Sequence, residues 1–386
     1  MSEKQIKVYF IAGEPSGDLL ASRLMRALRQ KLGDRVQFCG VGGETMAEEG
    51  LTSLFDISDL AIMGFFEVFK SLPIVLKRMR QIWDDIAKVQ PDIVITVDSW
   101  SFSQRIHAGM KKRHLNMPHI HYVAPQVWAW KAKRAKTIKK WIDHLLCLLP
   151  FEAPLFTKHG MPCTYVGHSV IESGADKGDE TRFFAEHPEV DPQSFIVTVL
   201  PGSRKTELKY LLPVFEQVVE RLKEKHPSLV VVMPTVQTVA QRLQQAVQMW
   251  KVPVIIVQGR QARYDAFAAS RLAVAASGTV SLELAMARIP HLIAYKLNRV
   301  TGFLARRVLK IKYVNLINIL ADQPIIPECL QENCTPDYIL AQVEKLSGPE
   351  GAEQIKRAET ELKKLGMSTQ PSQKAADKVL EILHEG

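Results

Sequence analysis

The chain has 386 residues, a length that exceeds what one hydrophobic core usually organises and that favours two domains. Hydrophobic residues make up 46% of it, but no run of 18 apolar residues occurs, which argues against a transmembrane helix. The 50 Lys and Arg against 41 Asp and Glu give a formal net charge of +9, which favours an anionic partner and leaves nucleic acid, phosphorylated metabolites and acidic lipid open.

The N-terminal half alternates strand-like and helix-like segments. We expect strands at Ile6–Ala12, Val36–Val41, Asp92–Val97, His119–Val123 and Leu145–Leu149, and helices near Leu19–Lys31, Phe65–Lys88 and Ser103–Arg113. The polar stretch from Glu172 to Gln193 is the expected linker.

The C-terminal half continues the alternation. Its expected strands are Phe195–Leu200, Leu229–Met233, Val254–Val257, Leu272–Ala275 and His291–Tyr295, and a last helical region from Glu353 to Leu383 is interrupted near Gly366 and Pro371. The sequence therefore predicts an α/β protein of two doubly wound, Rossmann-like domains that face each other across a cleft. The expected domains are residues 1–171 and 172–366, and a final helix at about 367–386 is expected to pack back on the first domain.

Two strand–turn–helix units lie about 190 residues apart. In the first, Gly13 and Gly17 permit close backbone approach, Ser16 can donate a hydrogen bond, and either Ser16 or Asp18 can cap the following helix. The second contains Gly202, Ser203 and Arg204 after the strand that ends at Leu200. Such turns suit a negatively charged ligand, although a capped turn without a ligand is the common alternative.

Asp98 ends another apolar strand. Because ligands bind at the carboxyl ends of parallel strands, a carboxylate there is well placed to be a general base. The alternative is an N-cap for the next helix.

Ser277, Gly278 and Thr279 follow the strand Leu272–Ala275 and open a helix. Their backbone N–H groups suit a phosphate, and Glu283, one turn later, can accept hydrogen bonds from a ribose diol. The alternative is a Ser277 cap with Glu283 as a surface acid.

Several other chemistries are disfavoured. Gly40 to Thr45 departs from the dinucleotide fingerprint at its third glycine, and there is no P-loop, H-E-x-x-H or D-x-D motif. We therefore expect no metal and no cofactor. Five scattered cysteines without a C-x-x-C pair, and a start without a signal-peptide pattern, favour a cytoplasmic location.

Six segments together resemble lipid-A-disaccharide synthases. They are Gly13-Glu14-Pro15-Ser16-Gly17-Asp18, the run from His121 to Trp130 with its Val-Trp-Ala-Trp, Leu148-Leu149-Pro150-Phe151-Glu152, Val166-Gly167-His168, Leu200-Pro201-Gly202-Ser203-Arg204, and Ala276-Ser277-Gly278-Thr279 with Glu283. The motifs occur in the family's order from residue 6 to about residue 320. The resemblance implies a metal-independent GT-B glycosyltransferase that joins UDP-2,3-diacylglucosamine to 2,3-diacylglucosamine 1-phosphate, releasing UDP and forming a β(1→6)-linked disaccharide.

The resemblance also implies roles for particular residues. Asp98 would take the proton from the acceptor 6-hydroxyl, and Arg204 would clamp the diphosphate as UDP leaves. The expected nucleotide and diphosphate site contains Gly13, Glu14, Ser16, Gly17, Gly202, Ser203, Arg204, Ser277, Gly278, Thr279, Glu283 and Asn318. Two departures from the family pattern are Ser101 in place of an acid and the pair Asn315 and Ile317 before Asn318. The family also suggests a homodimer.

Two alternatives remain at this stage. Another UDP-N-acetylglucosamine-dependent enzyme of the same fold, a transferase or an epimerase, would share most of these motifs. A nucleic-acid-binding protein would explain the tryptophans and lysines between Trp128 and Trp141, but it has no need of Asp98 or of paired phosphate turns. We therefore expect no nucleic-acid partner.

An amphipathic stripe is expected to associate with the anionic inner face of the inner membrane. It comprises Phe65, Phe66, Val68, Phe69, Leu72, Val75 and Leu76, with Met63 before it and basic residues beside it. Pro73 is expected to kink or divide the helix. The alternative is a helix whose apolar face packs on the core.

Overall fold

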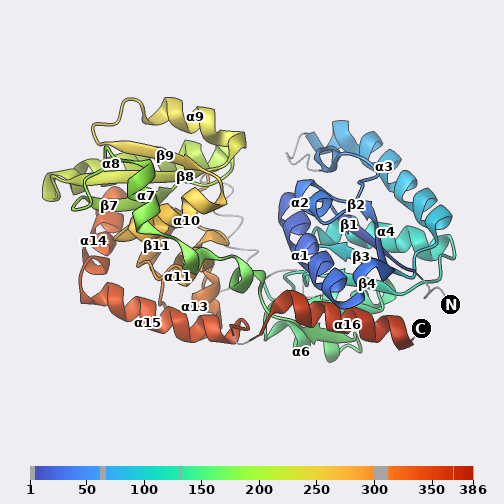
Figure 1. Ribbon diagram of the computed structural model, residues 1–386. Coiled ribbons are helices and arrows are strands. Elements are labelled where there is room, and N and C mark those ends of the chain that lie inside the picture. Colours follow the sequence, from blue (N-terminus) through green and yellow to red (C-terminus); the bar gives the residue numbers. More distant parts are fainter. Residues whose placement is uncertain (1–4, 61–66, 130–132, 299–311, 368, 386) are drawn as a thin grey trace. The chain divides into compact units, whose positions relative to one another are not determined.

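The computed structural model describes residues 5–60, 67–129, 133–298, 312–367 and 369–385. The chain divides into two compact units (Figure 1). Unit 1 comprises Met1–Ser169 and Ser368–Gly386, and unit 2 comprises Val170–Met367. The break at residue 169 lies two residues from the expected boundary.

Unit 1 contains a parallel sheet in the order β2-β1-β3-β4-β5-β6. Its strands are β1 (Ile6–Ala12), β2 (Val36–Val41), β3 (Ile93–Val97), β4 (His119–Tyr122), β5 (His144–Cys147) and β6 (Cys163–Tyr165). Its helices are α1 (Pro15–Leu32), α2 (Glu44–Glu48), α3 (Glu67–Val89), α4 (Trp100–Lys112), α5 (Arg134–Thr137), α6 (Glu152–Thr157) and α16 (Pro371–Glu385). Strands buried on both faces read as apolar runs, which is why the sequence revealed most of them.

Helices cover both faces of this sheet. Apolar side chains of α1 and α16 form one core with the sheet, and those of α3 and α4 form another on the opposite face. Ala375, Ala376 and Val379 of α16 belong to the first core, so the C-terminal helix packs within unit 1.

Unit 2 contains a parallel sheet in the order β12-β11-β10-β7-β8-β9. Its strands are β7 (Phe195–Leu200), β8 (Leu229–Thr235), β9 (Val254–Gln258), β10 (Leu272–Ala276), β11 (His291–Tyr295) and β12 (Glu328–Leu330). Its helices are α7 (Glu180–Glu186), α8 (Lys205–Lys225), α9 (Gln237–Val247), α10 (Arg260–Ala269), α11 (Val280–Met286), α13 (Leu316–Ala321), α14 (Pro336–Leu346) and α15 (Pro349–Lys364). Counted from its own first strand, this is the doubly wound order 3-2-1-4-5-6.

Each sheet has a point where the chain reverses its direction of winding. In unit 1 this switch point lies between β1 and β3, and in unit 2 between β7 and β10. Ligands of doubly wound sheets bind outside the carboxyl ends of the strands at such points. The turns singled out in the sequence follow these four strands.

The elements differ from the sequence expectations at three places. The stretch expected to be a linker contains α7, whose Phe183 is buried in a core with β7 and β8. Pro73 was expected to kink or divide its helix, and the division does not occur, because α3 runs as one helix from Glu67 to Val89. The three-residue strands β6 and β12 were not expected, because a run of three residues carries too little pattern to be recognised.

Candidate functional site

The switch point of unit 1 brings together the turn after β1 and the turn after β3. The Ser16 hydroxyl donates to Asp98 Oδ2 at 3.2 Å, and the Ser99 hydroxyl donates to Glu14 Oε1 at 2.6 Å. Gly17 allows the two turns to approach closely, because a Cβ at this position would stand 3.1 Å from the carbonyl oxygen of Val97. These two hydrogen bonds therefore form one polar site from residues that are 82 and 85 positions apart in the sequence.

The backbone at Asp98 is strained. Asp98 and Ser99 both adopt left-handed conformations, with φ of 58° and 44°. The backbone N–H of Asp98 donates to the carbonyl of Tyr122 at 2.9 Å, and its Oδ1 accepts from the N–H of Ser99 at 2.7 Å. Ser99, not Asp98, is the N-cap residue of α4. Such strain costs about 1–3 kcal/mol per residue and is concentrated at functional sites.

The two turns of this switch point carry one carboxylate each, Glu14 after β1 and Asp98 after β3. Two like charges disfavour a diphosphate and suit a neutral hydroxyl group that donates a hydrogen bond. We therefore interpret Gly13, Glu14, Ser16 and Gly17 as neighbours of the candidate base.

Asp18 does not cap its own helix. Its buried carboxylate accepts hydrogen bonds from the backbone N–H groups of Gly43, Thr45 and Met46, at 2.6 to 3.2 Å, and from the Thr45 hydroxyl at 2.6 Å. It therefore stabilises the start of α2. Glu14 is the N-cap residue of α1, without a side-chain capping bond, so the expectation of a Ser16 or Asp18 cap was wrong.

The switch point of unit 2 begins with the turn after β7. Gly202 has a φ of 107°, which a residue with a side chain rarely adopts. Ser203 and Arg204 are exposed, and their backbone N–H groups donate to Glu207 Oε2 at 2.9 and 3.2 Å. The Arg204 guanidinium donates to Glu207 Oε1 at 3.2 Å. Glu207, three residues into the capped helix α8, thus places a carboxylate against the groups expected to bind phosphate and accepts from the backbone N–H of the N-cap residue Arg204.

The second turn of this switch point follows β10. Gly278 and Thr279 are exposed, and we find no hydrogen bond from their backbone N–H groups to any described residue. Glu283 Oε1 accepts from Arg263 Nη2 at 3.1 Å and from the Tyr264 hydroxyl at 3.2 Å. Both partners come from α10, and the sequence analysis did not include either of them.

The side-chain amide of Asn318 is hydrogen-bonded within the chain. It is fully buried, and its Oδ1 accepts from the N–H groups of Ile325 and Ile326, both at 2.8 Å. Its Nδ2 donates to the Ile326 carbonyl at 2.8 Å and to Glu328 Oε1 at 2.9 Å. All four hydrogen bonds of the amide are used within the chain, which favours a turn-stabilising role over contact with a nucleotide.

The expected membrane stripe is only partly described. Met63, Phe65 and Phe66 lie outside the described residues, whereas Val68, Phe69 and Leu72 lie on α3. Val75 is half-buried and packs against the core-facing side chains of α3, an arrangement that favours the alternative of core packing at this position. Leu76 is 45% exposed and its neighbour Ile74 is 43% exposed.

Glu152 ends the Leu-Leu-Pro-Phe-Glu motif, and the sequence predicts no role for it. Its side chain is 3% exposed and accepts hydrogen bonds from the Leu149 N–H at 3.0 Å and from Trp128 Nε1 at 3.3 Å. Burial raises the pKa of Glu152 from 4.5 to about 7. Burial likewise lowers the pKa of His121, on β4, to about 3, so this histidine is neutral at physiological pH.

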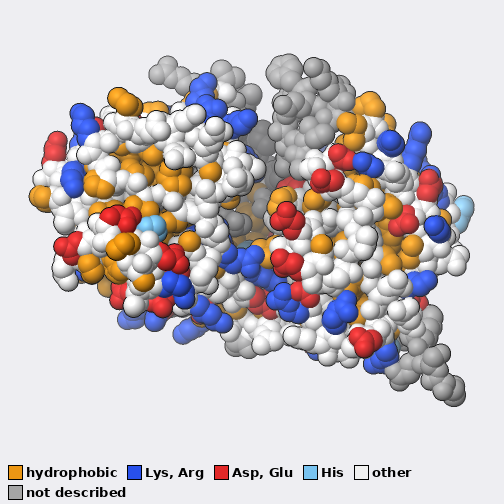
Figure 2. All heavy atoms as spheres, turned by 45° about the horizontal axis from the view of Figure 1, so that its top comes forward, with side chains coloured by type: hydrophobic (Ala, Val, Ile, Leu, Met, Phe, Trp, Pro, Cys, Tyr) orange, Lys and Arg blue, Asp and Glu red, His pale blue; other side chains and the backbone are white. Residues whose placement is uncertain are grey.

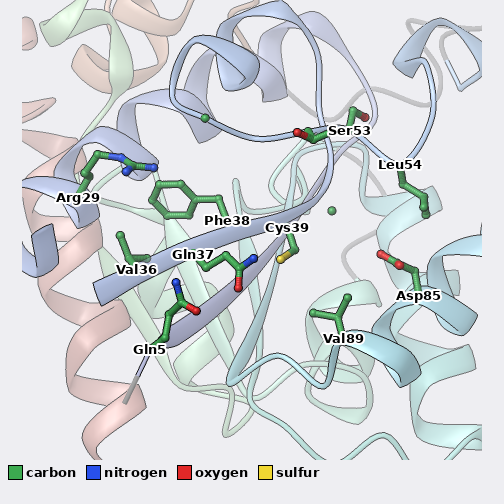
Figure 3. A pocket seen from close by; sticks show the side chains of 13 residues that line it. Gln5, Arg29, Val36, Gln37, Phe38, Cys39, Ser53, Leu54, Asp85 and Val89 are labelled. Carbon is green, nitrogen blue, oxygen red and sulfur yellow. The ribbon is translucent and has the colours of Figure 1, made fainter. Parts of the chain in front are cut away.

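A separate hollow of about 600 Å³ lies beside β2, the edge strand of the unit 1 sheet (Figure 3). Arg29, Cys39 and Asp85 are among its lining residues, and none of the predicted site residues lines it. The hollow is distinct from both switch points.

The comparisons with known proteins decide between the alternatives. Residues 8–382 match the family model described as lipid-A-disaccharide synthetase. The lipid-A-disaccharide synthase of Rhodospirillum centenum is 47% identical over 383 residues, covering 98% of this chain and 95% of that protein. The lipid-A-disaccharide synthase of Paramagnetospirillum magneticum is 47% identical and covers 98% of both chains. This chain belongs to the lipid-A-disaccharide synthetase family.

Solved structures support the fold of this family member. A UDP-GlcNAc 2-epimerase from Neisseria meningitidis, bound to UDP-GlcNAc, is 13% identical with a TM-score of 0.68, covering 99% of this chain and 100% of its own. The glycotransferase of kitacinnamycin is 14% identical with a TM-score of 0.61 and the same coverage. At such low identity these likenesses show the fold alone, the two-domain Rossmann-like fold of GT-B glycosyltransferases.

Proposed function

We propose that this protein is a lipid-A-disaccharide synthase. It joins UDP-2,3-diacylglucosamine to 2,3-diacylglucosamine 1-phosphate, releasing UDP and forming the β(1→6)-linked disaccharide 1-phosphate. The family match over residues 8–382 is the observation that carries the proposal.

In the proposed reaction Asp98 is the general base of an inverting displacement. It takes the proton of the acceptor 6-hydroxyl while that oxygen forms a bond to C1 of the donor sugar, and the bond from C1 to the diphosphate oxygen breaks. The half-buried position of Asp98 at the carboxyl edge of the sheet supports this role. Ser16 holds one carboxylate oxygen at 3.2 Å, a length that a substrate hydroxyl can compete with.

The donor nucleotide is assigned to unit 2. Arg204 has 70% of its side chain exposed and can neutralise the charge that builds on the leaving UDP. Gly278 and Thr279 offer backbone N–H groups to a phosphate, and the carboxylate of Glu283 can accept from the ribose diol. We propose that this charge neutralisation needs no metal and that no cofactor takes part.

We further propose that the protein works in the cytoplasm, bound peripherally to the anionic inner face of the inner membrane. In the described part of the chain, no helix has the length and apolarity needed to cross a bilayer. Ile74 and Leu76 of α3 expose apolar surface, with Lys77 and Arg80 exposed nearby. On the face in Figure 2, basic side chains are interspersed with acidic and apolar ones.

A homodimer is proposed from the family resemblance. Light scattering on the purified protein should give twice the chain mass of 43.5 kDa, and a mass of one chain would contradict it.

The function is tested with the purified protein and both acylated substrates. We expect a disaccharide product by mass spectrometry, with one UDP released per product. UDP release with unacylated UDP-N-acetylglucosamine and no disaccharide would instead favour an enzyme of another specificity.

A further inference from the structure

Glu152 is an acid in an unusual setting. It begins α6, immediately after the Leu-Leu-Pro-Phe segment that follows β5, and its side chain is buried. The groups that donate to it, the backbone N–H groups of Leu148 and Leu149 and the Trp128 indole N–H, are all neutral. A buried carboxyl held only by neutral donors is costly for the fold, so its presence calls for an account beyond packing.

The Trp128 partner belongs to the segment 123–129, which follows β4. Val123 opens the segment with a φ of 84°, a strained value for a β-branched residue. Ala124 and Val127 are buried, and Trp128 contacts Phe151 edge-to-face, with ring centroids 5.5 Å apart. Glu152 and Phe151 therefore hold the segment from the adjacent strand end.

The same segment also packs against the turn that carries Asp98. Trp100, two residues after Asp98, shares one hydrophobic cluster with Ala124 and Val127. The backbone N–H of Asp98 donates to the carbonyl of Tyr122, directly before the segment. A displacement of residues 123–129 would therefore reach Asp98 both through packing and through a backbone hydrogen bond.

We infer that Glu152 is a positioning residue for the sugar acceptor: through Trp128 it fixes segment 123–129, and with it the turn that carries Asp98. The inference rests on the proposed function, in which Asp98 is the base. Glu152 itself does not touch the reacting atoms. A misplacement of about 1 Å at a reacting centre can cost roughly 100-fold in rate, so a buried tether can matter at a distance.

Three variants test the inference in the disaccharide assay. Glu152→Ala removes the acceptor atoms, Trp128→Phe keeps an aromatic ring but removes the N–H, and Glu152→Gln keeps one carbonyl oxygen. For Glu152→Ala and Trp128→Phe we expect kcat to fall and KM for the monosaccharide acceptor to rise, with kcat/KM lower by roughly tenfold to 100-fold. Glu152→Gln should recover part of this loss, and calorimetric UDP affinity should stay within about twofold in all three, since the nucleotide is assigned to unit 2.

A matched control separates positioning from general loss of stability. Tyr9→Phe also removes a hydrogen bond from an aromatic side chain to a carboxylate in unit 1, because the Tyr9 hydroxyl donates to Asp85 at 2.7 Å. This bond lies on the face of the sheet that α3 covers. The substitution should lower the melting temperature and leave the acceptor KM unchanged. If Glu152→Ala does not fold, Trp128→Phe decides.

The outcomes are distinct. If the wild type forms the disaccharide and the folded variants keep its kcat and its KM for the acceptor, the inference is overturned while the proposed function stands. Equal kinetic losses in Tyr9→Phe and Trp128→Phe would also overturn it, because the effect would then follow stability. A wild-type protein that forms no disaccharide would overturn the proposed function, and this inference with it.

Discussion

At the scale of single residues, the position of Asp98 could be predicted and its conformation could not. An apolar strand that ends in a carboxylate is visible in the sequence, and the switch-point rule places it at a ligand site. The left-handed backbone at Asp98 and Ser99 leaves no mark on the apolar pattern, and the contacts to Ser16 and Glu14 join residues more than 80 positions apart. Asp18 illustrates the same limit, because it stabilises α2 and not its own helix.

The role of Asp98 predicts a specific loss. Asp98→Asn should lower turnover by roughly 100-fold or more, because a general base typically contributes 10²–10⁴-fold, while leaving UDP affinity nearly unchanged. Asp143→Asn is a suitable control. Asp143 accepts from the His119 N–H at the start of β4, so it lies at the amino ends of the strands, whereas Asp98 lies at their carboxyl ends. Turnover of Asp98→Asn close to that of the wild type would remove Asp98 as the base.

Glu152 predicts a pH dependence of stability. Its pKa is raised from 4.5 to about 7 by burial, so between these values the folded chain keeps a proton that the unfolded chain has lost. The contribution of this group is fully present below pH 4.5 and is lost as the pH rises through 7, by about 3 kcal/mol. The free energy of unfolding, measured with denaturant, should therefore rise for Glu152→Gln relative to the wild type between pH 4 and pH 8. A constant difference between the two proteins would contradict the burial effect.

Glu283 predicts a loss of nucleotide affinity. Glu283→Ala should weaken UDP by about 1–3 kcal/mol, the typical value of hydrogen bonds to a charged acceptor. Because Arg263 and Tyr264 also bind this carboxylate, Glu283→Gln serves as the control that keeps an acceptor oxygen. Unchanged UDP affinity in calorimetry would remove Glu283 from the site.

At the scale of elements, buried parallel strands were the most predictable part of the fold. Runs such as Ile93–Val97 are buried at every position, and composition alone marks them. The helix α7 was taken for a linker because its sequence is polar, and only its packing through Phe183 shows that it belongs to unit 2. The α3 stripe could not be assigned to core or surface from its spacing, because Val75 and Leu76 are adjacent and lie on different faces.

The exposed apolar side chains of α3 predict weaker membrane binding when they are replaced. The double variant Ile74→Ser with Leu76→Ser should reduce sedimentation with anionic vesicles, since less apolar area is transferred from water. A matched double variant, Val236→Ser with Met249→Ser, changes two exposed apolar residues of unit 2 and should not alter sedimentation. Equal sedimentation of both variants and the wild type would contradict the α3 surface.

At the scale of the whole molecule, the two units differ in the charge that they offer at their switch points. Unit 1 presents the carboxylates of Glu14 and Asp98 without a neighbouring cation among the contacts described above, whereas in unit 2 the carboxylates of Glu207 and Glu283 are paired with Arg204 and Arg263. This difference could be inferred only from the assembled turns, since Gly13 to Gly17 resembles a phosphate turn in the sequence. This difference supports the proposal that unit 1 binds the hydroxyl acceptor and unit 2 the nucleotide.

This division predicts where UDP protects the chain. UDP at 100 times its Kd should stabilise the state that binds it by about 2.7 kcal/mol, because the ligand binds the folded and not the unfolded form. Hydrogen exchange should slow at residues 202–207 and 277–283, and should change little at residues 13–18 and 98–103. The protection should persist in a chelator, as expected if Arg204 and backbone N–H groups neutralise the diphosphate without a metal. Protection confined to residues 13–18 would move the nucleotide to unit 1, and protection abolished by the chelator would contradict metal independence.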